Sequence, residues 1–223
     1  MKSQNLDALS RIVDLDKIEA TKNSINEANG LPNECYLNDE YFKIEREKVF
    51  FNNWIVVGVS SSVPEVGDAK PFNLMGIPLL ILRDKNNKIK VFHNVCSHRG
   101  MILVKEECKL KNTIRCPYHS WSYNFNGELI ATPHVGGMNI HETEGFIKSK
   151  SNLKEISTHV WMDLIFININ KKKKDFEGSI DPLEKQWSKF ISKKDQKLIR
   201  HAGDFGYFNM EVKSNWKFAI ENY

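Results

Sequence analysis

The chain has 223 residues, of which 41% are hydrophobic and 27% charged, and 32 Lys and Arg against 28 Asp and Glu give a net charge of +4. That length allows one large domain or two small ones with a buried core, and the charge is too small to indicate a nucleic-acid-binding protein. Because no stretch approaches the roughly 20 apolar residues of a membrane span, and the polar start lacks a signal peptide's apolar core, we expect a cytoplasmic protein that binds neither nucleic acid nor membrane.

Residues 1–50 are expected to form an N-terminal helical lead. The first part of this lead is interrupted by glycine and proline, which favour turns. Asn38 can then cap a helix that runs to about Phe51. Two acidic residues follow the cap, and the helix dipole favours acids in the first turn.

Residues 51–170 alternate short β-branched runs with turn signals, which predicts an antiparallel β-domain. The expected strands are WIVVGVS, PLLILRD, KIKVFHNV, SWSYNF, ELIATP and WMDLIFININ. A polar hairpin turn is expected over Asp84–Lys88. Asn126-Gly127 predicts a type I′ turn, because both central residues of that turn need a positive φ.

Residues 171–223 are expected to start a second domain, inside which the sequence stops. The run Lys171–Lys174 is interpreted as a solvated loop rather than a docking surface. Asp181-Pro182 opens a predicted helix through Phe190, and DFGYFNMEV is a predicted strand. A further helix is predicted from Asn215 onwards.

Two cysteines and two histidines form two mixed pairs, Cys96-Ser97-His98 and, seventeen residues later, Cys116-Pro117-Tyr118-His119. A structural zinc ion accepts two cysteines and two histidines, but zinc fingers usually keep like ligands together. In a Rieske centre one iron takes two cysteines and the other takes two histidines. Two loops that each give one ligand to each iron explain the mixed pairs. We therefore prefer a Rieske [2Fe–2S] cluster, held by Cys96, His98, Cys116 and His119, to a zinc site.

Several residues beside these pairs are candidates for the shell of the cluster. Gly100 can let the backbone turn sharply there, and Pro117 removes a backbone donor next to Cys116. The hydroxyl of Tyr118 can hydrogen-bond near a cluster sulfur, which tunes the potential. Trp121 can either donate its indole N–H toward the cluster or pack the β-core.

The segments VFHNVCSHRG, CPYHSWSYNFNGELIATP and SNWKFAIENY resemble the large subunits of Rieske non-haem iron oxygenases. That family includes aromatic-ring dioxygenases and choline- or carnitine-type monooxygenases and demethylases. The resemblance covers about residue 38 to the end. It implies a mainly β fold with an antiparallel Rieske [2Fe–2S] domain, N-terminal helices and the start of an α+β helix-grip catalytic domain.

The resemblance also implies an oxidoreductase whose cluster is reduced by a ferredoxin or flavin reductase. The cluster would pass electrons to a mononuclear Fe(II) in the neighbouring subunit of a homotrimer, where O2 hydroxylates or demethylates a small organic substrate. Arg99 is a candidate contact to that subunit. Glu221 and Asn222 match the start of the family's iron-binding segment, but the ligands of that iron are expected only in a full-length protein. Ser120 stands where glycine is common in the family.

Two other functions are left open by the sequence. A stand-alone Rieske ferredoxin would be a monomer that carries electrons without consuming O2. A non-redox zinc-binding module would be colourless and would contain zinc without acid-labile sulfide. The other two cysteines, Cys35 and Cys108, are expected to be free thiols in a reducing compartment.

Overall fold

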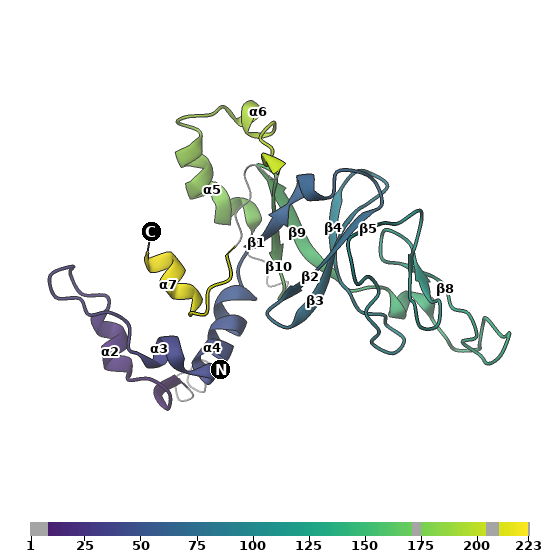
Figure 1. Ribbon diagram of the computed structural model, residues 1–223, viewed down its shortest axis with the longest axis horizontal. Coiled ribbons are helices and arrows are strands. Elements are labelled where there is room, and N and C mark those ends of the chain that lie inside the picture. The colour runs from purple at the N-terminus through teal and green to yellow at the C-terminus, as the bar shows by residue number, and fades with distance from the viewer. Residues whose placement is uncertain (1–8, 171–174, 204–209, 223) are drawn as a thin grey trace. The chain divides into compact units, whose positions relative to one another are not determined.

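The computed structural model describes residues 9–170, 175–203 and 210–222 (Figure 1). Its described residues divide into two compact units, a helical unit of residues 9–51 with 210–222 and a β-unit of residues 52–170 with 175–203. This division differs from the expected one, in which everything after residue 170 starts a separate domain. The run Lys171–Lys174 and most of the strand predicted from Asp204 lie outside the described residues.

The helical unit contains α2 (Leu15–Ala20), α3 (Glu34–Leu37), α4 (Asp39–Glu45), the π-helical turn η1 (Arg46–Phe50) and α7 (Trp216–Glu221). Asn38 caps α4 as predicted, because its side chain accepts the backbone N–H groups of Glu40 and Tyr41 at 2.9 and 3.0 Å. Asn215 caps α7 in the same way, through the N–H of Lys217 at 3.1 Å. Among the described residues, no helix is long and apolar enough to cross a membrane.

A buried ion pair joins α7 to α4 within the helical unit. Lys217 Nζ lies 2.8 Å from Glu45 Oε1, and both residues are less than a tenth exposed. Trp216 donates its indole N–H to Glu45 at 3.1 Å. The rings of Tyr36, Tyr41 and Trp216 lie 5.2, 5.5 and 5.3 Å from the ammonium. The contact holds together segments that are 172 residues apart in the sequence.

The β-unit is built on a seven-stranded sheet of order β1-β10-β9-β4-β3-β2-β5 and a three-stranded sheet of order β6-β7-β8. Its strands are β1 (Ile55–Val59), β2 (Asp68–Leu74), β3 (Ile77–Arg83), β4 (Ile89–His93), β5 (Cys108–Lys109), β6 (Ile114–Arg115), β7 (Ser122–Tyr123), β8 (Leu129–Ala131), β9 (Glu155–Trp161) and β10 (Leu164–Asn168). Its short helices are η2 (Ser60–Ser62), η3 (Lys148–Ser151), α5 (Phe176–Trp187) and α6 (Lys193–Gln196). The strands pair antiparallel, which confirms the mainly β prediction.

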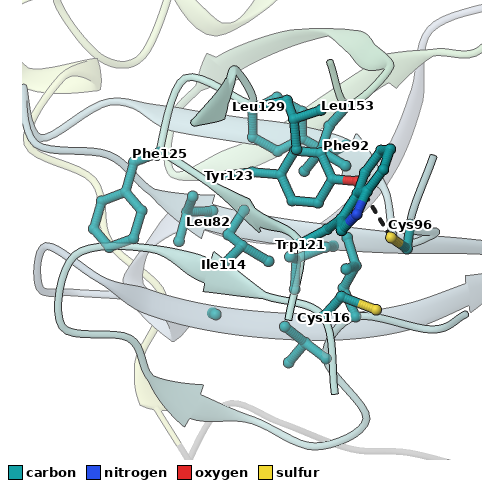
Figure 2. Close-up of a cluster of buried hydrophobic side chains, with 14 residues drawn as sticks. Leu82, Phe92, Cys96, Ile114, Cys116, Trp121, Tyr123, Phe125, Leu129 and Leu153 are labelled. Atoms are coloured by element: carbon teal, nitrogen blue, oxygen red, sulfur yellow. Dashed lines mark hydrogen bonds between the residues drawn. The ribbon is translucent and has the colours of Figure 1, made fainter. Parts of the chain in front are cut away.

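Strand β3 separates two hydrophobic clusters. Leu80 and Leu82 belong to one cluster, and Leu79 and Ile81 belong to the other. Successive side chains of a strand point to opposite faces of the sheet, so β3 is buried on both sides. The cluster on the Leu80 side also contains both cysteines of the Cys/His pairs (Figure 2). One of the two cores therefore supports the predicted metal site directly.

Helix α5 begins at Phe176, five residues before the start that the sequence predicts. Asp175 caps it by accepting the N–H of Gly178 at 3.1 Å. Phe176 is buried and its ring lies 5.2 Å from that of Trp54, edge to face. The cap and this packing fix the start of α5, and Pro182 lies inside the helix.

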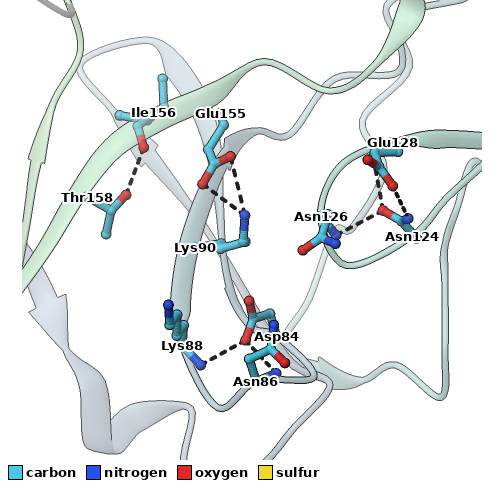
Figure 3. A network of polar contacts seen from close by, with 10 residues as sticks. All are labelled: Asp84, Asn86, Lys88, Lys90, Asn124, Asn126, Glu128, Glu155, Ile156 and Thr158. Atoms are coloured by element: carbon cyan, nitrogen blue, oxygen red, sulfur yellow. Dashed lines mark hydrogen bonds and ion pairs between the residues drawn. The ribbon is translucent and has the colours of Figure 1, made fainter. Parts of the chain in front are cut away.

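The turn at Asn126-Gly127 is not the predicted type I′ turn, because only Gly127 has a positive φ there, of 80°. Asn124 instead accepts the N–H groups of Asn126 and Glu128 at 2.9 and 3.0 Å. The turn over Asp84–Lys88 repeats these contacts, with Asp84 as the acceptor (Figure 3). A short carboxylate or amide that accepts two nearby N–H groups favours this longer turn.

Candidate metal centre

The two loops that carry the Cys/His pairs follow the same backbone path. We call Cys96–Met101 the first Cys–His loop and Cys116–Trp121 the second Cys–His loop. In each loop the N–H of the first residue donates to the carbonyl of the sixth residue, at 2.8 Å in both loops. The N–H of the fifth residue donates to the carbonyl of the first residue, at 3.0 Å in the first loop and 3.1 Å in the second. The fifth residue has a positive φ in both, 70° at Gly100 and 60° at Ser120.

The loops bring the four predicted ligands together in their mixed pairs. The rings of His98 and His119 are 4.9 Å apart between centroids, and Cys96 and Cys116 are both buried. Burial raises the pKa of the Cys96 thiol; a hydrogen bond with Tyr123 opposes that rise and the neighbouring Cys116 adds to it. Burial also lowers the pKa of His98, and His119 beside it lowers it further. Burial therefore favours neutral imidazole, which is the form that binds metal, while two buried thiolates need a nearby positive charge.

One ring nitrogen of His119 is buried, with its hydrogen-bonding capacity unused by the described part of the chain. Its Nδ1 atom is buried and has no hydrogen-bond partner among the described residues. Such an atom costs about 1–3 kcal/mol unless something satisfies it. No three His, Cys, Asp or Glu side chains of the described chain gather around a single ion position, and a Rieske cluster asks for only two protein ligands at each iron. The donor set and the open ring nitrogen fit such a cluster.

A tyrosine hydroxyl lies beside one of the cysteine sulfurs, and it belongs to Tyr123. Tyr123 Oη is 3.3 Å from Cys96 Sγ (Figure 2). It also accepts the N–H of Ser97 at 3.1 Å. Burial first, and then the contact with Cys96, raises the pKa of Tyr123 to about 12, so the hydroxyl keeps its proton. The sequence suggests this role for Tyr118, whose side chain is 56% exposed. Residues two apart in a strand lie on the same face of the sheet. Tyr123 follows Trp121 by two residues and is buried like it, and this spacing is the signal that could have identified Tyr123.

The other predicted shell residues line the same site in different ways. Trp121 is buried in the core and its ring stacks on that of His98 at 4.6 Å, so packing is its observed role. The ring of Tyr118 lies 3.7 Å from that of His119. Arg99 lines a pocket of about 680 Å³ at the two loops, together with both histidines. Gly100 supplies the turn of the first loop, as predicted, and Pro117 lies exposed in the second.

Glu221 and Asn222 lie in the helical unit. Glu221 accepts the hydroxyl of Tyr36 at 2.7 Å, and this bond is the main reason why the pKa of Tyr36 rises to about 12. Asn222 is the residue at the C-terminal end of α7. Cys35 is buried and Cys108 exposed, and both are free thiols, as predicted.

Residues 53–144 match the family model of the Rieske [2Fe–2S] domain. This part of the chain is therefore a Rieske domain, and its cofactor is a [2Fe–2S] cluster. Over most of its length the chain is similar to the oxygenase subunits of Rieske oxygenases.

Two curated relatives illustrate that relationship. The chain is 28% identical over 193 residues to the carnitine monooxygenase oxygenase subunit of Acinetobacter pittii, an alignment that covers 86% of this chain and 49% of that protein. It is 28% identical over 189 residues to the 2-aminobenzenesulfonate 2,3-dioxygenase subunit alpha of an Alcaligenes species, covering 84% and 45%. The chain thus spans about half the length of the curated relatives that it matches.

The fold is similar to that of a solved Rieske oxygenase. The apo form of the quaternary ammonium Rieske monooxygenase CntA superposes with a TM-score of 0.65 and 26% sequence identity. The match covers 72% of this chain and 45% of that chain. The similarity therefore extends beyond the 92-residue span of the Rieske domain match at residues 53–144.

Proposed function

We propose that Cys96, His98, Cys116 and His119 hold the [2Fe–2S] cluster and that the chain is the electron-transfer part of a Rieske oxygenase. The observation that carries the proposal is the pair of equivalent loops, each of which presents one cysteine and one histidine from the same backbone turn. The open Nδ1 of His119 supports the same assignment. When bound, a cluster of this type accepts and releases one electron, at a potential raised by its imidazole ligands.

The chain's own residues shape this site. Trp121 stacks on His98 and fixes the plane of its ring. Tyr123 supplies a protonated hydroxyl beside Cys96. The core on the Leu80 side of β3 buries both cysteines and excludes water from the sulfur side. The two imidazoles face the pocket of about 680 Å³, which is where we expect electrons to leave or enter.

The reaction and partners that we propose follow the named relatives. Those relatives are a carnitine monooxygenase oxygenase subunit and a dioxygenase alpha subunit. One structure of a quaternary ammonium Rieske monooxygenase is reported to give insight into inter-subunit electron transfer in that protein. We propose that a ferredoxin or flavin reductase reduces the cluster. In the complete oxygenase, a homotrimer, a mononuclear Fe(II) would then use O2 to oxidise a small organic substrate.

The test of the cluster is the iron and acid-labile sulfide content per chain of anaerobically purified protein, with an EPR spectrum after reduction. We expect about two irons and two sulfides and a Rieske-type signal. Cys96→Ala and His119→Ala should lose the cluster. Cys108→Ala and His134→Ala should keep it, because they remove the same residue types from positions outside the two pairs.

Zinc without sulfide in the purified protein would overturn the assignment. Full cluster content in Cys96→Ala would overturn the proposed ligand set while leaving the domain assignment intact. The oxygenase part of the proposal requires that the reduced complete protein consumes O2 faster when its substrate is added. A cluster that shuttles electrons between partners with no such substrate dependence would instead identify an electron carrier.

A further inference from the structure

The two Cys–His loops differ at one position of their shared backbone path. The fifth residue is Gly100 in the first loop and Ser120 in the second, and both have a left-handed φ. Nothing lies within 4 Å of the place where a Cβ on Gly100 would stand. The cost of a Cβ at this position is therefore a backbone cost, equivalent to roughly five- to thirtyfold in an equilibrium constant.

The second loop has a side-chain contact at this same position. Arg115 Nη2 donates a hydrogen bond to Ser120 Oγ at 2.8 Å, and the hydroxyl of Ser122 donates to the Ser120 carbonyl at 3.0 Å. Arg115 directly precedes the second loop, and Val95 occupies the equivalent place before the first. A valine side chain offers no donor. The second loop thus combines a serine at its fifth position with a preceding arginine, whereas the first loop combines a glycine at its fifth position with a preceding valine.

We infer that Arg115 is a positioning residue, whose guanidinium clamps Ser120 and so holds the second loop in the left-handed turn that presents His119. Arg115 directly precedes Cys116 and Ser120 directly follows His119, so the clamp closes the loop around both residues. Arg115, His119 and Ser120 also line the same pocket. The inference rests on the proposed function, because the loop matters as a ligand loop only if it holds the cluster.

The clamp is an exposed hydrogen bond. It competes with water, so its loss should weaken the loop rather than unfold it. Replacing Ser120 by glycine should remove the need for the clamp altogether, because glycine adopts a positive φ without strain. That asymmetry makes the inference testable with four variants: Arg115→Met, Ser120→Ala, Ser120→Gly and the double variant Arg115→Met/Ser120→Gly.

The measurement is the rate at which each cluster-loaded protein loses iron to an excess of chelator. Arg115→Met and Ser120→Ala should lose iron severalfold faster than the unaltered protein. Both variants keep a Cβ at position 120, where φ is positive, and both lack the hydrogen bond of the clamp. Ser120→Gly should be no faster than the unaltered protein, and the double variant should match Ser120→Gly. Gly100→Ser is the matched control: it places the same serine in the first loop behind Val95, and should accelerate iron loss.

The EPR g-values of the reduced cluster distinguish the clamp from a general destabilisation of the fold, because a destabilised protein would not regain the original g-values in the double variant. The g-values should shift in Arg115→Met, because that variant releases Ser120, which directly follows His119. They should return to those of the unaltered protein in the double variant. Arg115→Met that loses iron at the unaltered rate, or that is equally harmful in the Ser120→Gly background, would overturn the clamp. Unaltered protein without iron and sulfide would instead refute the proposed function.

Discussion

Tyr123 connects the two Cys–His loops through a single hydroxyl. It follows the second loop in sequence, yet it contacts Cys96 and Ser97 of the first loop. The hydroxyl of Ser97 donates to the carbonyl of Ser151, and the Tyr123 oxygen accepts the Ser97 N–H. The Tyr123 hydroxyl can therefore donate its own hydrogen bond either to the Cys96 sulfur or to the Ser97 side-chain oxygen. An anionic sulfur is the stronger acceptor of the two.

Replacing Tyr123 with phenylalanine should lower the midpoint potential of the cluster. A hydrogen bond to a cluster sulfur stabilises the reduced state, which carries one more negative charge. Loss of about 1 kcal/mol of that stabilisation corresponds to on the order of 50 mV for a one-electron couple. The potential is measured by EPR-monitored redox titration.

Tyr118→Phe is the control for this change, because it removes the same hydroxyl from an exposed side chain. We expect its potential to equal that of the unaltered protein. Equal potentials for Tyr123→Phe and the unaltered protein would show that the Tyr123 proton goes to Ser97.

The sequence predicts the four candidate ligands, but the hydroxyl that the structure places at a cysteine sulfur belongs to Tyr123 and not to Tyr118, the tyrosine that the sequence suggests. Cys96, His98, Cys116 and His119 are recognisable because metal chemistry dictates residue types at short spacings. A hydrogen bond from Tyr123 depends instead on where β7 places its side chain relative to another loop. Tyr118 is the donor expected from the sequence because it lies between two candidate ligands there. In the structure its ring packs against that of His119.

At the scale of elements, the β9–β10 hairpin is held at its turn by Asp163. Met162 and Asp163 have φ values of 49° and 69°, which suits the two-residue turns that match strand twist. The Asp163 carboxylate accepts the Ser61 N–H and hydroxyl at 3.1 and 2.7 Å, and the His201 N–H at 2.9 Å. The carboxylate therefore ties the hairpin to η2 and to the segment after α6.

Asp163→Asn should destabilise the β-unit at neutral pH by about 1–2 kcal/mol, because one acceptor is lost from a buried network. Burial alone would raise the pKa of Asp163, but the hydrogen bonds from Ser61 and His201 outweigh it and lower that pKa. A depressed folded-state pKa gives stability that is present above the ordinary value near 4 and is lost as pH falls through the folded-state value.

The difference between the two proteins in free energy of unfolding should therefore be constant from about pH 5 to 8 and shrink below pH 4. Urea titrations followed by tryptophan fluorescence at several pH values measure it. Asparagine tolerates the left-handed φ of this position, so backbone strain does not obscure the comparison. A difference that grows toward acidic pH would contradict the assigned direction of the pKa shift.

Elements buried on both faces, or capped by a polar side chain, were predictable from sequence. The apolar run in β3 and the Asn38 cap of α4 are examples. Strand β2 was missed because Pro71 interrupts its run. β5 pairs only with Asp68 and Ala69, so β2 has a free edge at Pro71, where proline is tolerated. That edge is a property of the sheet and leaves no signal in the sequence of β2 itself.

At the scale of the molecule, the helical unit is assembled from two segments that the β-unit separates in sequence. Lys217→Met should destabilise this unit by about 3–5 kcal/mol, because it leaves the Glu45 carboxylate buried without its cation. Hydrogen exchange of the amides in α4 and α7 measures the loss. Iron content should be unchanged, because both Cys–His loops belong to the β-unit.

The double variant Glu45→Leu/Lys217→Met separates a charge effect from a packing effect. Replacing both members of a buried pair with apolar residues is often neutral or stabilising, so protection of α4 and α7 should largely return. Exchange as fast as in Lys217→Met alone would show that the ammonium matters for its packing against Tyr36 and Tyr41 rather than for its charge.

The Glu45–Lys217 pair also sets an order of events during synthesis on the ribosome. The two residues are 172 positions apart, which corresponds to roughly 10 to 30 seconds of translation. Throughout that interval Glu45 is already made and its cation does not yet exist, while the strands of the β-unit emerge and can pair. The iron–sulfur domain can thus be complete before the helical unit closes, and α7, which is translated after the β-unit, completes a structure that α4 began.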